Sequence, residues 1–319
     1  MQAVFISPVK KRVLFWKLLG IIFLIVLISR IKWEDTIYIL HNSNLKYFLL
    51  ACLLEPMRFF IDTIRWKLIL HFQRINYSFK DAFVVNLASC YLGHVTPARI
   101  GNFIRGFYLS CDRRIPLGLS FSSVIWEKYL ELVFTLFIGL WGTIIYISGF
   151  NLVYIICMGL FIVICLFYFL YSFDIQKKLF KSITIRIPKL RGLSIENFHN
   201  GLKLINFKVL LVCIIITICS FLIFAFQGYL ITMAVNINIK FLDFAVIFYM
   251  SKMISRLVPV SFSGWGSKDV FLILIFKNIG IDEKLALAFT ILFLFSSYFV
   301  SLLLGFIAWE RKALIWQKT

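Results

Sequence analysis

Residues 210–226 read LLVCIIITICSFLIFAF and contain no charged side chain. A helix of about this length can cross the hydrocarbon core of a bilayer, which is about 30 Å thick. Similar apolar runs lie at residues 21–28 and 285–307. Hydrophobic residues make up 61% of the 319 positions and charged residues 15%, whereas soluble domains contain roughly 45–50% and 25%. The sequence therefore predicts an all-α polytopic membrane protein.

Six full-length transmembrane spans are predicted from the apolar runs. They lie at about residues 13–30, 46–71, 117–147, 151–172, 207–235 and 284–309. The first is interpreted as a span and not as a cleaved signal, because no small-residue cleavage site follows it. The longest polar stretch, residues 174–208, is too short for a soluble catalytic domain. We therefore expect residues 1–319 to form a single transmembrane domain.

Two further apolar stretches, at about residues 82–96 and 242–258, are slightly short for a span. Each ends at a cluster of proline and glycine, which reads PARIGN at residues 97–102 and PVSFSGWG at residues 259–266. Irregular backbone at membrane depth is tolerated only where protein or a water-filled cavity surrounds it. We therefore expect two re-entrant helical hairpins, although two complete spans per hairpin would give the same topology.

The two hairpins share a spacing. Asp81 precedes Pro97 by sixteen residues, and Asp243 precedes Pro259 by the same sixteen. Counting spans makes the first hairpin enter from the cytoplasm and the second from outside. The sequence thus predicts an inverted repeat, the plan on which many secondary transporters build a site at the bilayer midplane. The halves cover about residues 46–147 and 207–309 and are joined by the basic loop 173–208.

The net charge of +19 comes from basic residues that gather between the apolar runs. Lys and Arg concentrate in the cytoplasmic loops of membrane proteins, and beside spans they normally face anionic lipid. This distribution argues against a nucleic-acid partner. It predicts a protein of the cytoplasmic membrane whose two termini and 173–208 loop are cytoplasmic.

One predicted span carries four charged residues, Glu55, Arg58, Asp62 and Arg65. Their spacing of three, four and three residues places them on one helical face, where opposite charges can pair. Ionisable groups within a membrane usually face a bundle interior or a wet cavity. The stripe is therefore interpreted as an intramembrane charge network, either a purely structural ladder or part of a polar pathway. Arg65 could instead snorkel to the interface.

The hairpin tips are the candidate binding sites. A helix restarts after each proline, and a helix N-terminus attracts anions. Phosphate is the natural anion for a ligand that arrives from the bilayer, and Lys252 and Arg256 lie upstream of the second tip. The alternative is that the glycines only turn the chain while the basic groups reach lipid headgroups. The predicted substrate-binding residues are Arg99, Gly101, Asn102, Arg105, Ser261, Ser263, Gly264, Gly266, Lys268 and Asp269.

Two expectations concern the remaining polar residues. Glu127, Lys128 and Glu131 begin the next long span and either balance the charges of the tip or mark an interfacial helix start. The seven cysteines form no C-x-x-C pair and the four histidines are scattered. Neither a structural disulfide nor a metal site is therefore expected, and no cofactor is predicted.

Two motifs carry a family resemblance. The first comprises Arg65-Trp66, Pro97-x-Arg99-x-Gly101-Asn102-x-x-Arg105 and Glu127-Lys128. The second is Pro259-Val260-Ser261-x-Ser263-Gly264-x-Gly266-x-Lys268-Asp269. In this order, over about residues 45–310, they resemble the lysylphosphatidylglycerol synthase transmembrane family, also called flippase-like, whose second signature is P-x-S-x-G-G-x-G-x-R-E. The chain departs from that family at Asn102, where an acidic residue is usual, at Ser263, which replaces a glycine, and at Lys268-Asp269, which replaces Arg-Glu.

The resemblance implies a flippase or transporter that moves a polar or phosphate-bearing lipid across the membrane. Family members are fused to lysyl-lipid synthase or glycosyltransferase domains, and this chain is expected to act on a lipid made by a separately encoded enzyme. An isoprenoid-phosphate sugar and an aminoacylated phospholipid are the candidate lipids. One alternative is an integral-membrane glycosyltransferase, to which Glu34-Asp35 gives a superficial likeness. Another is a non-transporting partner of a lipid-modifying enzyme.

Overall fold

The computed structural model of the chain describes residues 41–146, 194–204, 207–257 and 267–312, with isolated positions at 159, 172, 173, 176 and 177. The predicted span 13–30, most of the predicted span 151–172 and the second proline-glycine cluster lie outside the described residues. The described part of the chain is helical, with no strand. It therefore agrees with the predicted all-α class.

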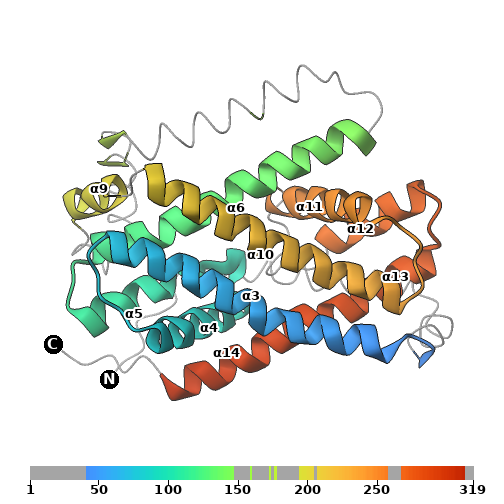
Figure 1. The fold of residues 1–319 in the computed structure, drawn as a ribbon, viewed down its shortest axis with the longest axis horizontal. Coiled ribbons are helices and arrows are strands. Elements are labelled where there is room, and N and C mark those ends of the chain that lie inside the picture. The colour runs from blue at the N-terminus through green and yellow to red at the C-terminus, as the bar shows by residue number, and fades with distance from the viewer. Residues whose placement is uncertain are drawn as a thin grey trace, which may run out of the picture.

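Figure 1 shows long helices packed side by side with shorter helices between them. In chain order they are α3 (Leu45–Phe72), α4 (Phe79–Val95), the 3-10 helix η1 (Pro97–Phe103), α5 (Ile104–Arg113), α6 (Leu117–Tyr146), α9 (Ile195–Lys203), α10 (Phe207–Ala234), α11 (Phe241–Leu257), α12 (Ser267–Asn278), α13 (Glu283–Phe293), the π-helical segment η4 (Leu294–Phe299) and α14 (Val300–Arg311).

Three of the described helices are long and apolar enough to cross a membrane. They run from Leu117 to Tyr146, from Lys208 to Ala234 and, through the π-helical segment, from Glu283 to Arg311. The predicted spans 117–147, 207–235 and 284–309 are thus confirmed as long apolar helices. The predicted span 46–71 forms α3, which has 28 residues and a length of about 42 Å. Large apolar side chains on the outer surface, such as Phe137 and Leu242, suit contact with lipid.

Helices α3 and α10 pack against each other in opposite directions (Figure 1). The backbone N–H of Asn44, before α3, donates to the carbonyl of Ala234, at the end of α10, over 2.9 Å. Both helices have 28 residues. Each is followed by a residue with a left-handed backbone, Arg74 (φ 61°) or Asn236 (φ 59°). Closing backbone bonds of this kind satisfy the last helical carbonyls.

The second half matches the first at a constant interval. Phe207 lies 162 residues after Leu45, where α10 and α3 begin. Helices α4 and α11 have 17 residues each, and Phe241 again lies 162 residues after Phe79. These helices correspond to the predicted short stretches 82–96 and 242–258. The shared interval extends the spacing that the sequence predicted from aspartate to proline.

Two glycines let the long helices approach the hairpin helices closely. A Cβ atom at Gly305 of α14 would lie 2.8 Å from Cβ of Tyr91 on α4. A Cβ atom at Gly139 of α6 would lie 2.5 Å from Cβ of Met253 on α11. Real Cβ atoms do not approach this closely, so both crossings depend on glycine. Helix α14 therefore packs on α4, and α6 packs on α11.

Candidate functional site

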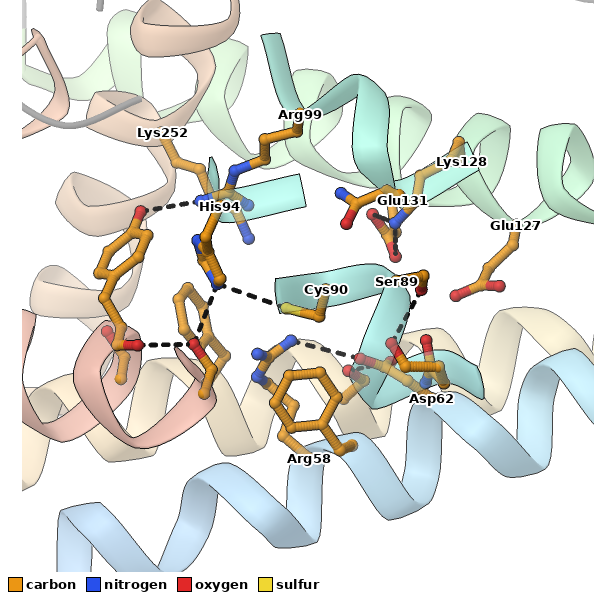
Figure 2. Close-up of a pocket in the computed structure, with 18 of the residues that line it drawn as sticks. Arg58, Asp62, Ser89, Cys90, His94, Arg99, Glu127, Lys128, Glu131 and Lys252 are labelled. Carbon is orange, nitrogen blue, oxygen red and sulfur yellow. Dashed lines mark hydrogen bonds and ion pairs between the residues drawn. The ribbon is translucent and has the colours of Figure 1, made fainter. Parts of the chain in front are cut away.

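The described helices surround a polar cavity of about 470 Å³ (Figure 2). Arg58 and Ser220 line it from opposite sides. Arg58 is the fourteenth of the 28 residues of α3, and Ser220 is the fourteenth of the 28 residues of α10. The cavity therefore lies halfway along two helices that are each about 42 Å long.

The charged stripe of α3 faces this cavity and pairs within itself. The guanidinium of Arg58 donates to both carboxylate oxygens of Glu55 and, at 3.2 Å, to Oδ2 of Asp62. Ser220 of α10 donates its hydroxyl to the other Asp62 oxygen at 2.7 Å. The side chains whose spacing predicted a common face are thus in contact with one another and with the facing helix.

Arg65, one turn further along α3, is fully buried. Its guanidinium lies 3.3 Å from Asp62, 2.9 Å from Glu127 and 2.9 Å from Glu131. It also donates to the hydroxyl of Thr217 at 3.1 Å. Arg65 therefore does not snorkel to an interface but joins α3, α6 and α10 behind the cavity wall.

The acidic residues of α6 neutralise basic residues from both halves. Glu127 pairs with Arg105 of α5 at 2.7 Å, and both side chains are about 2% exposed. Glu131 pairs with Lys128 at 3.0 Å and lies 3.9 Å from Arg256 of α11. The geometry favours the role of balancing the tip charges, one of the two roles that the sequence left open for this acidic group.

The first hairpin tip folds back onto α4, and glycine makes this possible. A Cβ atom at Gly101 would lie 2.2 Å from the backbone carbonyl of Leu92, and one at Gly93 would lie 2.1 Å from Oδ1 of Asn102. The N–H of Gly101 donates to Oγ1 of Thr96 at 2.7 Å. Of the predicted binding residues at this tip, Gly101 therefore shapes the turn, while Asn102 lines the cavity.

Arg99 holds an unusual backbone conformation at the same tip. Its φ of 54° lies in the left-handed region, which residues other than glycine, Asn and Asp seldom adopt. Its guanidinium donates to the hydroxyl of Tyr298 in the π-helical segment at 3.0 Å and lies 5.5 Å from the centre of that ring. The strained residue therefore links the first tip to the last long helix across the cavity (Figure 2).

The second half contributes two lysines to the cavity. Lys268 of α12 lies 3.4 Å from the carboxylate of Asp269 and 4.4 Å from the centre of the Phe293 ring. Lys252 of α11 lies 4.5 Å from the centre of the Phe224 ring. The remaining predicted binding residues of this half, Ser261, Ser263, Gly264 and Gly266, lie outside the described residues.

Several cavity residues were not predicted from the sequence. Cys90 and His94 of α4 lie one turn apart, with Sγ 3.3 Å from Nε2, and the same imidazole nitrogen lies 2.9 Å from Oγ of Ser301 on α14. Asn86 accepts a hydrogen bond from Arg105 at 3.3 Å. A signal for three of them existed in the sequence, since residues 86, 90 and 94 recur every four positions on one helical face.

The described lining carries an excess of positive charge. It contains seven basic side chains (Arg58, Arg99, Arg105, Lys128, Lys252, Arg256, Lys268) and four carboxylates (Glu55, Asp62, Glu127, Glu131), a formal difference of +3. Within the described residues, no group of three or more His, Cys, Asp or Glu side chains could hold a metal ion. The described site is thus built to attract anions, and its chemistry rests on side chains alone.

The cavity residues Arg99, Arg105, Glu127 and Lys268 include the motif positions of a known family. The family described as lysylphosphatidylglycerol synthase TM region matches residues 13–305. The chain belongs to this family. As a member of the lysylphosphatidylglycerol synthase TM family with long apolar helices, it is an integral membrane protein.

Relatives of the chain carry the UPF0104 designation. UPF0104 membrane protein MJ1595 of Methanocaldococcus jannaschii is 26% identical over 314 residues, which cover 91% of this chain and 92% of that protein. UPF0104 membrane protein MJ1078 of the same organism is 26% identical over 224 residues, 67% of this chain and 91% of that protein. A UPF0104 membrane protein of Methanothermobacter thermautotrophicus is 22% identical over 291 residues, 84% of this chain and 85% of that protein. The likeness thus extends over most of the transmembrane region.

Proposed function

We propose that this protein is a flippase that moves an anionic, phosphate-bearing lipid across the cytoplasmic membrane. The observation that carries the proposal is the position and charge of the cavity, which has a formal excess of +3 among its described lining residues and lies halfway along α3 and α10. A cavity of about 470 Å³ falls within the range of small-ligand sites. It can hold a headgroup, while the acyl or isoprenoid chains remain in the surrounding hydrocarbon.

The physical problem that such a protein solves is desolvation. A charged headgroup that enters hydrocarbon loses its water and gains no compensating hydrogen bonds, so its passage is costly. Arg99, Lys252 and Lys268 line the cavity and would supply the missing interactions at mid-depth. Candidate lipids remain an isoprenoid-phosphate sugar and an aminoacylated phospholipid, and the family name supports a lipid substrate.

The proposed mechanism is alternating access in an inverted repeat with halves at about residues 46–147 and 207–309. Three observations support it: the constant 162-residue interval, the antiparallel packing of α3 on α10, and the equivalent glycine crossings of α14 on α4 and α6 on α11. The 17-residue helices α4 and α11 are about 26 Å long, which supports re-entrant hairpins. The distribution of Lys and Arg supports cytoplasmic termini and a cytoplasmic loop.

The test is reconstitution of the purified full chain into vesicles that contain a trace of fluorescent lipid. An impermeant quencher measures how fast labelled lipid leaves the inner leaflet. We expect faster movement of an anionic phospholipid than in protein-free vesicles, and little acceleration of an uncharged diacylglycerol with the same label. Equal rates for the anionic lipid with and without protein would contradict the proposal. Sugar transfer to an acceptor in detergent, where no bilayer exists, would favour the glycosyltransferase alternative.

A further inference from the structure

The cations of the cavity fall into two groups according to what holds them. Most are paired with carboxylates: Arg58 with Glu55 and Asp62, Arg105 with Glu127, and Lys128 and Arg256 with Glu131. A carboxylate within hydrogen-bonding distance cancels most of the field that a cation exerts on a third group. These residues fix the helices together but offer little net charge to a ligand.

Lys252 is held differently. Its ammonium lies 4.5 Å from the ring centre of Phe224, 5.2 Å from that of Phe221 and 5.3 Å from that of Tyr249. Among the described residues no hydrogen bond or ion pair to this ammonium occurs. Aromatic faces attract a cation through their quadrupole, but they carry no net charge. The three rings therefore position Lys252 and leave its full positive charge facing the cavity.

Lys268 lies against a connected set of rings. Its ammonium is 4.4 Å from the ring centre of Phe293 and 5.5 Å from that of Phe248. Both rings contact Phe224, with centres 5.6 Å and 5.2 Å away, and Phe224 is the ring nearest to Lys252. One aromatic wall therefore carries both ammonium groups, although Lys268 also has Asp269 at 3.4 Å.

We infer that Lys252 and Lys268 form a phosphate-binding subsite on this aromatic wall, which consists of Phe221, Phe224, Phe248, Tyr249 and Phe293. Two like charges on one low-dielectric wall repel each other, so an anion between them is stabilised by both. Arg99 extends the subsite, because its guanidinium bonds Tyr298, whose ring centre is 5.6 Å from the Lys268 ammonium. This inference rests on the proposed function and places the phosphate in the second half, away from Arg105.

The experiment measures phosphate binding to the purified full chain in a neutral detergent by titration calorimetry. The two probes are inorganic phosphate and a water-soluble dihexanoyl phosphatidic acid. We expect Lys252→Gln and Lys268→Gln each to weaken binding about tenfold to a hundredfold, as the loss of a charged hydrogen bond does. Lys277→Gln is the matched control, because Lys277 lies on the same helix as Lys268 and is exposed, with a side chain 62% accessible. It should bind like the wild type.

A second variant separates the aromatic wall from the charge. Phe224→Leu keeps both lysines but removes the ring that positions Lys252, and we expect weaker binding, with Lys252→Arg largely restoring what Lys252→Gln loses. Folding is checked by the elution profile and by the melting temperature without ligand. If Lys252→Gln misfolds, Phe224→Leu and Lys268→Gln decide the question. Wild-type affinity in folded Lys268→Gln and Phe224→Leu proteins would overturn the inference.

The two probes distinguish the source of the phosphate and separate this inference from the proposed function. Tighter binding of the phosphatidic acid, competed by inorganic phosphate, identifies a lipid headgroup. Binding of inorganic phosphate alone, lost in Lys252→Gln, keeps the subsite but counts against a lipid substrate. Lipid movement by vesicles of both lysine variants at the wild-type rate, together with wild-type affinity, keeps the flippase and rejects the subsite.

Discussion

Tyr146, the last residue of α6, donates its hydroxyl to the carboxylate of Asp243 in the first turn of α11 over 2.9 Å. The other half contains the same relationship, because Lys312 beyond α14 lies 3.5 Å from the carboxylate of Asp81 in the first turn of α4. Asp243 follows Asp81 by 162 residues, the interval that separates the paired helices. Each hairpin is thus fastened at its entry point by the end of a long helix.

The contact between Lys312 and the first hairpin is expected to restrict entry to the cavity from the cytoplasm. Lys312 also bonds Asp112 and Tyr77, so Lys312→Met removes all of these contacts at once. Exposed ion pairs contribute about 0–1 kcal/mol, and the protein should remain folded. In a variant whose only cysteine is Cys90, which lines the cavity, Lys312→Met should accelerate labelling by a maleimide added from the cytoplasmic side. An unchanged rate would mean that Lys312 does not restrict access.

Arg65 is expected to be indispensable for stability. Its removal leaves Asp62, Glu127 and Glu131 with too little positive charge in a buried site, and the loss of one partner of a buried pair costs about 3–5 kcal/mol. Arg65→Met should therefore lower the melting temperature strongly in detergent. Arg65→Lys should recover only part of the loss, since an ammonium lacks the planar fork that reaches several carboxylates. Lys67→Met, on the exposed side of the same helix, serves as the control; a similar effect there would contradict the assignment.

The two glycines of the first tip should differ in how their substitution can be rescued. Alanine at Gly93 meets the side chain of Asn102, whereas alanine at Gly101 meets the backbone of Leu92. Overpacking of this kind costs typically about 1–3 kcal/mol. We expect Asn102→Ala to restore the melting temperature of Gly93→Ala but not that of Gly101→Ala. Rescue of both, or of neither, would show that the tip does not fold back on α4 as described.

The proposed topology makes a prediction for two exposed lysines. Lys240, between α10 and α11, should lie outside, and Lys203, at the end of α9, should lie in the cytoplasm. In a cysteine-free background, an impermeant maleimide added to intact cells should label Lys240→Cys and not Lys203→Cys. Both should react after the membrane is opened. Labelling of Lys203→Cys in intact cells would reverse the orientation and remove support for the inverted repeat.

The sequence was sufficient for the features that depend on local spacing. Charges three and four residues apart on one helix predicted the stripe from Glu55 to Arg65, and the aspartate-to-proline interval predicted matching hairpins. The pairing of Arg105 with Glu127 could not be predicted in the same way, because the two residues lie on different helices and only packing brings them together. The cage around Lys252 depends on rings from two helices, and aromatic residues are too frequent in this chain for any of them to stand out.

The glycine crossings have a consequence for how the chain divides into moving parts. Gly305 lies in the last helix of the second half and packs on α4 of the first, while Gly139 lies in the first half and packs on α11 of the second. The two repeats have therefore exchanged their last helices, in the manner of a domain swap within one chain. A hairpin that tilts would carry the foreign helix with it, so the mechanical bodies are α4 with α14 and α11 with α6. Neither body is contiguous in sequence, and a fragment that ends in the loop between the repeats would contain one incomplete half of each.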